Sequence, residues 1–308
     1  MLRGRVDDIG GIGRSTYLQA FRVSAARPPY YSLADGAPAT PEDKLFKRYP
    51  HGGWSRYSKA RVDDCLKRLR DIGRLQIEDA EIDLLQRVAN VESSGRIQCI
   101  NSYDSAYMSM GFMQWPIVYT DAYSPDGKLQ RLIQRAPEAF RRYGIELDPD
   151  RRYRITTRSG TYTPIAVKGA VRPSDLRGLD WAKRFYAAGL DVDVIVEEAK
   201  LALQVIEETK KRIETHKKYK IGTAFQPYYT RSAVLRALIQ ETFNNRPVYL
   251  LVALERAIAR AKRMGEITTS QFLDLTRRAI MEVYRTKEPK DGPSKARNLI
   301  HKTAKLVL

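Results

Sequence analysis

The chain has 308 residues, of which 43% are hydrophobic and 29% charged, so wholesale disorder is excluded and one large domain or two smaller ones can form. No segment approaches the ~20 apolar residues that span a bilayer, and the basic residues 1–5 lack the apolar run of a secretory signal peptide. The net charge of +18 predicts a polyanionic partner. Two cysteines and three scattered histidines are too few for a disulfide scaffold or a structural zinc site. No cofactor is expected.

Residues 1–60 are expected to form a loop-rich N-terminal arm, because glycine and proline clusters at residues 10–13, 27–29 and 36–38 interrupt regular structure. The glycine cluster lacks the Lys-Ser/Thr pair of a P-loop, which favours a flexible arm over a nucleotide site. The arm is expected to dock onto a partner or to wrap the core of the same chain.

The rest of the chain has the periodicity of a mainly α-helical protein, with apolar residues at helical spacing and natural boundaries at Gly73, Pro247 and Gly265. Thr268 or Thr269 is expected to be an N-cap. Helices are predicted from about residue 61 to Gly73 and over residues 77–93, 111–115, 128–143, 191–219, 231–243, 247–264 and 268–285.

The long helix predicted over residues 191–219 has glutamates early, at Glu197 and Glu198, and lysines late. That polarity suits the helix dipole, since acidic side chains stabilise the N-terminal end and basic ones the C-terminal end.

One stretch has a β pattern. Residues 151–170 alternate apolar residues with arginines on either side of a Ser159-Gly160 turn, which predicts a β-hairpin inserted into a single domain over residues 61–286. Residues 287–308 are expected to form a basic C-terminal tail. Cys65 and Cys99 are expected to be buried thiols that form no disulfide.

The segment that points to chemistry includes residues 88–95. Glu92 follows Leu85 by seven residues and Val88 by four, so it is expected to continue the buried face of its helix. Burial and the negative end of the helix dipole both raise the pKa of a carboxyl group there, and Gly95 is the expected C-cap. A carboxylic acid that stays protonated near neutral pH can protonate a glycosidic oxygen. On helix position alone, a structural glutamate at the edge of a core remains the simpler interpretation.

The residues that follow Glu92 favour the catalytic interpretation. The motif consists of Glu92-Ser93, then Ala106 and Ser109, then Gly111-Phe112-Met113-Gln114. This ordered set resembles the lysozyme-like superfamily, especially soluble lytic transglycosylases and goose-type lysozymes. The resemblance implies a lysozyme-like helical core in which Glu92 is the catalytic acid. It also implies that the sugar cleft is lined by Ser93, Ser109, Gly111, Met113 and Gln114.

The motif departs from the family in three places. The loop between Glu92 and Gln114 is longer than in typical transglycosylases. Phe112 replaces the leucine that is usual in the family. Phe243-Asn244-Asn245 resembles only loosely the Tyr-Asn element that the family has later in its sequence. Because phenylalanine lacks the tyrosine hydroxyl, the downstream wall of the cleft is expected to differ from that of the family.

Asp104 is the second candidate catalytic residue. It lies in a loop expected to fold back over Glu92, in the neighbourhood where goose-type lysozymes place an acidic residue. A second carboxylate activates water for inversion or stabilises an oxocarbenium-like transition state. An equally good interpretation makes Asp104 a helix cap. In that case a transglycosylase mechanism remains, in which Glu92 acts first as acid and then as base for attack by the sugar's own hydroxyl.

Aromatic residues cluster around the motif. Tyr103 and Tyr119 are candidate substrate-binding residues, because sugar rings stack on aromatic faces. Trp115 is expected to belong to the core, as most large aromatic side chains do.

The basic excess lies in the second part of the chain. Residues 121–308 carry 37 Lys and Arg against 22 Asp and Glu, whereas residues 1–120 carry 17 against 14. Such a field attracts nucleic acid, anionic lipids or the acidic polymers of a cell envelope.

The favoured function is cleavage of peptidoglycan glycan strands. The protein would act at the cell wall or in the periplasm after delivery by a bacteriophage, an injection machine or a secretion system. Anionic envelope polymers would hold its basic part. One alternative is a non-enzymatic lysozyme-like adaptor or glycan-binding component of such a machine. Another is a non-specific nucleic-acid-binding protein, although no nucleic-acid-binding motif is recognised.

Overall fold

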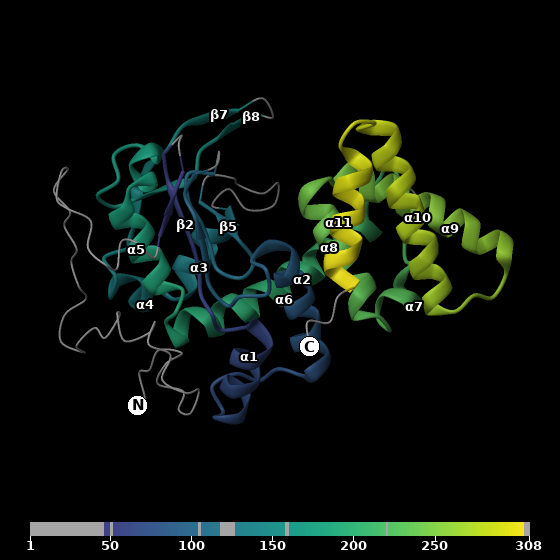
Figure 1. Cartoon of the computed structure of the whole chain (residues 1–308), viewed down its shortest axis with the longest axis horizontal. Helices are drawn as coiled ribbons and strands as arrows, with labels where there is room; N and C mark the ends of the chain where they lie inside the picture. Colours follow the sequence, from purple (N-terminus) through teal and green to yellow (C-terminus); the bar gives the residue numbers. More distant parts are fainter. Residues whose placement is uncertain are drawn as a thin grey trace. The chain divides into compact units, whose positions relative to one another are not determined.

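The computed structural model describes residues 46–49, 52–103, 106–117, 127–157, 160–219 and 221–304. These residues form eleven α-helices and small antiparallel sheets (Figure 1), which confirms the mainly helical class. They divide into two compact units. The first contains the described residues up to Leu75 together with Arg96–Lys200, and the second contains Gln76–Gly95 and the chain from Leu201 onward. Most of the predicted arm, residues 1–45, lies outside the described residues.

The first unit contains a five-stranded antiparallel sheet with the strand order β1-β2-β3-β4-β5. Its strands have two to four residues each, which is too short for an alternating pattern to appear in the sequence. The strands are β1 (Lys47–Arg48), β2 (Trp54–Tyr57), β3 (Cys99–Asn101), β4 (Ser109–Met110) and β5 (Trp115–Pro116). The sheet therefore joins the end of the expected arm to the segment that carries the motif.

Residues 111–115 do not form the predicted helix. Met110 of β4 pairs with Trp115 of β5, and the four residues between them make a turn, called the 111–114 turn below. Gly111 has a φ of +81° and Gln114 a φ of +48°, both in the left-handed region that a right-handed helix excludes. The helix prediction was wrong here because helical spacing of apolar residues cannot reveal such backbone angles.

The helices of the first unit follow the predicted ones closely in most places. The helix that begins near residue 61 ends before Gly73, as predicted. The helix predicted over residues 128–143 is divided in two, because Pro137 lacks the N–H needed inside a helix and begins a new one. The helical segments are α1 (Val62–Asp71), α3 (Gly127–Arg135), α4 (Pro137–Arg141), the 3-10 helix η4 (Pro173–Arg177), α5 (Leu179–Ala188) and the start of α6 (Val192–Glu214).

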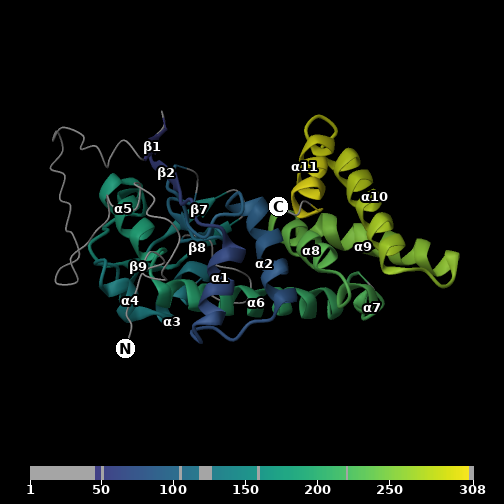
Figure 2. The same ribbon diagram turned by 60° about the horizontal axis from the view of Figure 1, so that its bottom comes forward.

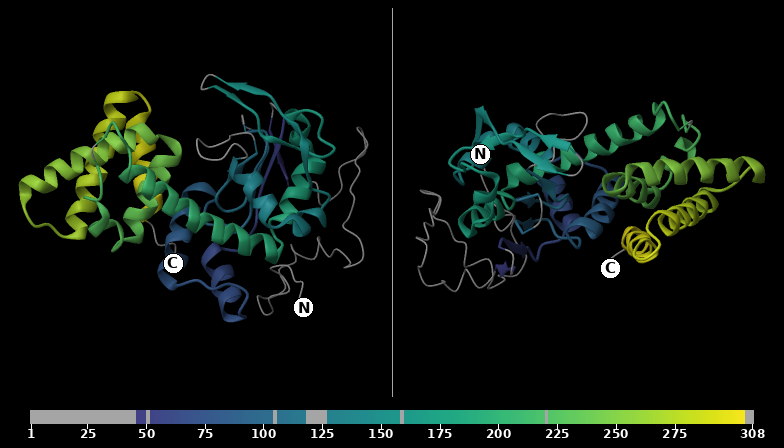
Figure 3. Two further views of the ribbon diagram at one scale, coloured as in Figure 1. Left: turned by 180° about the vertical axis from the view of Figure 1, so that it is seen from behind. Right: turned by 90° about the horizontal axis from the view of Figure 1, so that it is seen from above.

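The predicted hairpin is present in the first unit. Strand β7 (Ile155–Thr157) pairs with β8 (Gly160–Tyr162), and Ile155 lies opposite Tyr162. A second antiparallel pair, β6 (Leu147–Arg152) with β9 (Ile165–Val167), forms its base. Figure 3 shows this ribbon from behind, with β7 and β8 leading away from the strands of the larger sheet. The insertion is thus a long two-part ribbon.

The second unit is entirely helical in its described part. It contains the end of α6 together with α2 (Asp79–Glu92), α7 (Gln226–Tyr229), α8 (Ala233–Asn245), α9 (Pro247–Met264), α10 (Thr269–Lys287) and α11 (Gly292–Ala304). The N-cap prediction is confirmed at Thr268, whose Oγ1 accepts the Gln271 N–H at 3.2 Å. Figure 2 shows α9, α10 and α11 side by side. Ala296 and Leu299 of α11 are buried in the core of this unit, so the stretch expected as a tail contributes to that core.

Both cysteines are buried and are not joined by a disulfide, as expected. Burial raises the pKa of the Cys65 thiol to about 12, which disfavours the reactive thiolate. In the described chain, no helix has both the length and the apolar character needed to cross a membrane.

Candidate functional site

Glu92 is the last residue of α2 and is half-buried. The apolar face predicted for this helix is present, because Leu84, Leu85 and Val88 are fully buried. Glu92 lies one turn beyond Val88, where the burial of the helix decreases. Within the described ranges, the Glu92 carboxylate takes part in no hydrogen bond or ion pair. It therefore has no competing partner among these residues.

The end of α2 is closed by backbone geometry. Ser93, not Gly95, is the C-cap, and its N–H donates to Ala89 O at 2.8 Å. The Ser93 hydroxyl is buried and donates to the same carbonyl at 3.2 Å, so this side chain closes the helix. Ser94 and Gly95 have φ of +56° and +77° and reverse the chain. The predicted cap at Gly95 was therefore two residues too late.

Polar contacts fix α2 within the second unit. The Arg87 guanidinium donates to the carbonyls of Thr303 and Ala304 at 3.2 Å each, and so satisfies acceptors at the end of α11. Arg87 also forms an ion pair with Asp83 at 2.9 Å. α2 packs against α8, the helix that contains Phe243-Asn244-Asn245. These contacts give the helix that ends at Glu92 a fixed place in its unit.

The 111–114 turn belongs to the first unit and is held by side-chain amides. Gln98 Oε1 accepts the Gly111 N–H at 2.9 Å, and Gln114 Nε2 donates to Cys99 O at 3.0 Å and to Gly111 O at 3.1 Å. The side chains of Met113 and Ser109 are buried. Of the predicted cleft residues in this segment, only Gln114 has a side chain that is partly exposed.

A buried glutamate that was not predicted as a site residue lies against this turn. Glu198 of α6 is completely buried, and its Oε1 accepts the Met113 N–H at 3.1 Å. Burial raises the pKa of the Glu198 carboxyl group to about 8, partly opposed by the backbone N–H groups of Met113 and Phe112 and by the nearby indole N–H of Trp115. The polarity of the helix, which groups Glu198 with Glu197, did not reveal that Glu198 is buried.

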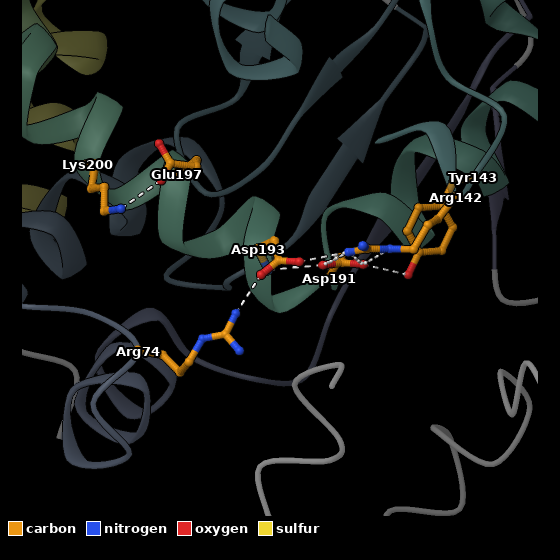
Figure 4. Close-up of polar contacts among 7 residues, drawn as sticks. All are labelled: Arg74, Arg142, Tyr143, Asp191, Asp193, Glu197 and Lys200. Carbon is orange, nitrogen blue, oxygen red and sulfur yellow. Dashed lines mark hydrogen bonds and ion pairs between the residues drawn. The ribbon is translucent and has the colours of Figure 1, made fainter. Parts of the chain in front are cut away.

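The start of α6 is anchored by a network of ion pairs (Figure 4). Arg142 bonds both carboxylate oxygens of the buried Asp191 at 2.7 and 2.8 Å, and Asp191 accepts the Asp193 N–H at 3.0 Å. Arg142 and Arg74 also reach Asp193, at 3.0 and 2.6 Å. Tyr143 donates its hydroxyl to Asp191 at 3.2 Å. The network fixes the helix that carries Glu198.

The aromatic candidates have different outcomes. Tyr103 is half-buried, and its ring stacks on Tyr49 with the ring centroids 3.8 Å apart. Trp115 belongs to the core, as predicted. Asp104 and Tyr119 lie outside the described residues.

The structure thus brings Gly111, Met113 and Gln114 together with Gln98 and Glu198 in the first unit, whereas Glu92 and Ser93 belong to the second. The chemically capable groups are the half-buried carboxylate of Glu92 and the buried carboxyl group of Glu198. No protein-family model, curated protein or solved structure matches the chain.

Proposed function

We propose that this protein has a lysozyme-like core and cleaves the glycan strands of peptidoglycan as a muramidase or lytic transglycosylase, with Glu92 as the general acid. The observation that carries the proposal is the position of Glu92 and the absence of a charge partner for its carboxylate among the described residues. Its carboxylate ends a helix with a buried inner face, and no partner in the described ranges neutralises it. A half-buried carboxylate without a competing partner among these residues can reach a glycosidic oxygen and serve as its proton donor.

In this mechanism Glu92 donates its proton to the glycosidic oxygen as the bond to the anomeric carbon breaks. The resulting carboxylate then accepts a proton from the attacking group. In a muramidase that group is water, and Asp104 is the candidate carboxylate for assisting it. In a lytic transglycosylase it is a hydroxyl of the sugar itself, and Asp104 is then dispensable.

The 111–114 turn supports the proposal as a rigid polar surface for a sugar. The amide nitrogen of Gln114 is held by two carbonyls, whereas its Oε1 makes no hydrogen bond in the described part of the chain. This oxygen is suited to accept a hydrogen bond from a sugar hydroxyl. The two inward bonds fix the orientation of the amide before a ligand arrives.

The charge of the chain supports a polyanionic surface as the place of action. Residues 201–308 carry 22 Lys and Arg against 10 Asp and Glu. A positive field attracts anionic envelope polymers and holds the protein near them. This attraction does not depend on the sequence of the polymer or on the cleavage step.

Clearing of a peptidoglycan suspension tests the proposal. Wild type should clear the suspension, and Glu92→Gln should remove nearly all activity while leaving the fold unchanged. Glu255→Gln is the matched control, since Glu255 is an exposed helical glutamate of the same unit, and it should clear like wild type. Binding to walls without any clearing would favour the non-enzymatic adaptor. Full clearing by a folded Glu92→Gln variant would remove Glu92 from the mechanism.

A further inference from the structure

We propose that Glu198 is the positioning residue of the 111–114 turn and that, through this turn, it sets the surface that receives the sugar. The inference rests on the proposed function for its second part only. The first part, that Glu198 determines the conformation of the turn, stands on the contacts of the described residues.

Three observations place the Glu198 carboxyl group against the turn. Its Oε1 accepts the Met113 N–H at 3.1 Å, in the middle of the turn. A Cβ atom on Gly111 would lie 2.0 Å from the same oxygen and 2.6 Å from Oε2, so the backbone passes directly over the carboxyl group. The backbone N–H of Phe112 also acts on it. The adjacent Glu197 differs, because within the described ranges its ion pairs are with Lys200 at 2.7 Å (Figure 4) and with Arg135 at 3.9 Å.

The hydrogen bonds of Glu198 fit a neutral carboxylic acid. Oε2 is buried and has no hydrogen-bond partner among the described residues. A carboxylate oxygen without a partner in such a place would be costly, whereas a protonated acid carries no charge. The groups that act on the pKa of this carboxyl are the Met113, Phe112 and Trp115 N–H groups and burial itself, with no charged side chain among them. Among the described residues, these N–H groups are therefore all that opposes the cost of a negative charge at Glu198.

Ionisation of Glu198 consequently acts on the turn. Because the pKa of Glu198 is raised to about 8, the acid is neutral at pH 6 and ionised at pH 9. A buried charge without a counter-charge favours movement of the carboxylate toward water, which breaks the bond to Met113 and releases the turn. Gln114, whose Nε2 donates to Gly111 O, moves with the turn.

Glu198→Gln and Glu198→Ala separate the alternatives. Glutamine keeps an oxygen that accepts the Met113 N–H and cannot ionise, so it imitates the neutral acid at every pH. Alanine removes the acceptor and leaves a cavity beside Gly111. Glu197→Gln is the matched control, because it makes the same change at the adjacent position outside the contact.

The experiment follows cleavage of glycan strands and the Trp115 indole N–H signal between pH 6 and pH 9. The chain has three tryptophans, and Trp54→Phe and Trp181→Phe variants assign the remaining signal to Trp115. We expect the wild-type indole signal to titrate near pH 8 and cleavage to fall about tenfold by pH 9, because one pH unit above its pKa roughly a tenth of the acid remains protonated. Glu198→Gln should lose the indole titration and keep a larger share of its pH 6 cleavage at pH 9 than wild type does, and Glu197→Gln should behave like wild type in both measurements.

Two results would overturn the inference. One is an indole titration near pH 8 that persists in Glu198→Gln, and the other is a folded Glu198→Ala variant with the cleavage rate and apparent KM of wild type. If wild type cleaves no glycan but Trp115 titrates in wild type and not in Glu198→Gln, the proposed function fails, while the control of the turn by Glu198 is supported.

Discussion

Glu198 occupies the space that a side chain on residue 111 would fill. A Cβ atom at Gly111 would lie 2.0 Å from Glu198 Oε1, closer than nonbonded atoms approach, and Gly111 also has a φ of +81°. Glycine is therefore required at this position for two independent reasons, the backbone angle and the approach of the carboxyl group.

Gly111→Ala should be much more destabilising than a change at a glycine with a similar backbone angle in open space. Gly73 provides this control, since its φ is +72° and no atom lies near the position of an added Cβ. We expect Gly73→Ala to lower the free energy of unfolding by about 1 kcal/mol and Gly111→Ala by more than about 2 kcal/mol. Urea unfolding of both variants measures the difference. Equal losses would show that Glu198 does not crowd residue 111.

Glu198→Gln should change how stability depends on pH. In the folded chain Glu198 keeps its proton up to a pKa of about 8, against an ordinary value of 4.5. Between these values the folded state holds a proton that the unfolded state has released, so the stability of wild type falls as the pH rises. Above pH 8 the folded state bears the full cost of a buried, ionised carboxylate.

The variant lacks this contribution. We expect the difference between the free energies of unfolding, variant minus wild type, to increase by roughly 3–5 kcal/mol as the pH rises from about 5 to 9. Denaturant unfolding of both proteins across this range provides the test. A constant difference would place the pKa of Glu198 near its ordinary value.

The ion pairs at the start of α6 should differ in strength according to burial. Asp191 is buried and bound by Arg142 through two oxygens, whereas the side chain of Asp193 is 38% exposed. Asp191→Ala removes the bonds to Arg142 and Tyr143 and the acceptor of the Asp193 N–H at the helix start, and should cost about 2–3 kcal/mol. Asp193→Ala should cost less than about 1 kcal/mol, because water screens its pairs. Similar losses in the two variants would contradict this ranking.

The helices were largely predictable because their signals are local. Apolar spacing located α9 and α10, and Thr268 marked a start that the structure confirms as a capping box. The strands of the five-stranded sheet and the 111–114 turn were not predictable in this way, whereas the β7–β8 hairpin was. Their short lengths and the positive φ of Gln114 depend on pairing between distant residues and on the contact with Glu198.

The burial of Glu198 did leave a signal in the sequence. It lies three residues after Ile195 and three before Leu201, and both of these are fully buried, so helical spacing puts Glu198 on the apolar face. The interpretation by helix dipole treated it together with Glu197 and missed this difference. What the carboxyl group contacts could not be read from spacing, because Met113 is far away in the sequence.

Binding to cell walls should be strongly sensitive to salt. The basic residues are spread over several helices and act as a diffuse field, which is screened as the ionic strength passes ~0.15 M and the Debye length falls to about 8 Å. Cleavage of short uncharged glycan fragments should change much less. Parallel salt titrations of wall binding and fragment cleavage measure both. Selection of one DNA sequence over random DNA at physiological salt would instead support the nucleic-acid-binding alternative.

The central claim is that Glu92 donates the proton that breaks the glycan strand. Mass spectrometry of the soluble products from purified peptidoglycan tests it most directly. Wild type should release muropeptides, with reducing ends for a hydrolase or anhydro ends for a transglycosylase, and folded Glu92→Gln should release almost none, while Glu255→Gln releases the same products as wild type. Equal release by Glu92→Gln and wild type, or no release by any folded form of the protein, would contradict the claim.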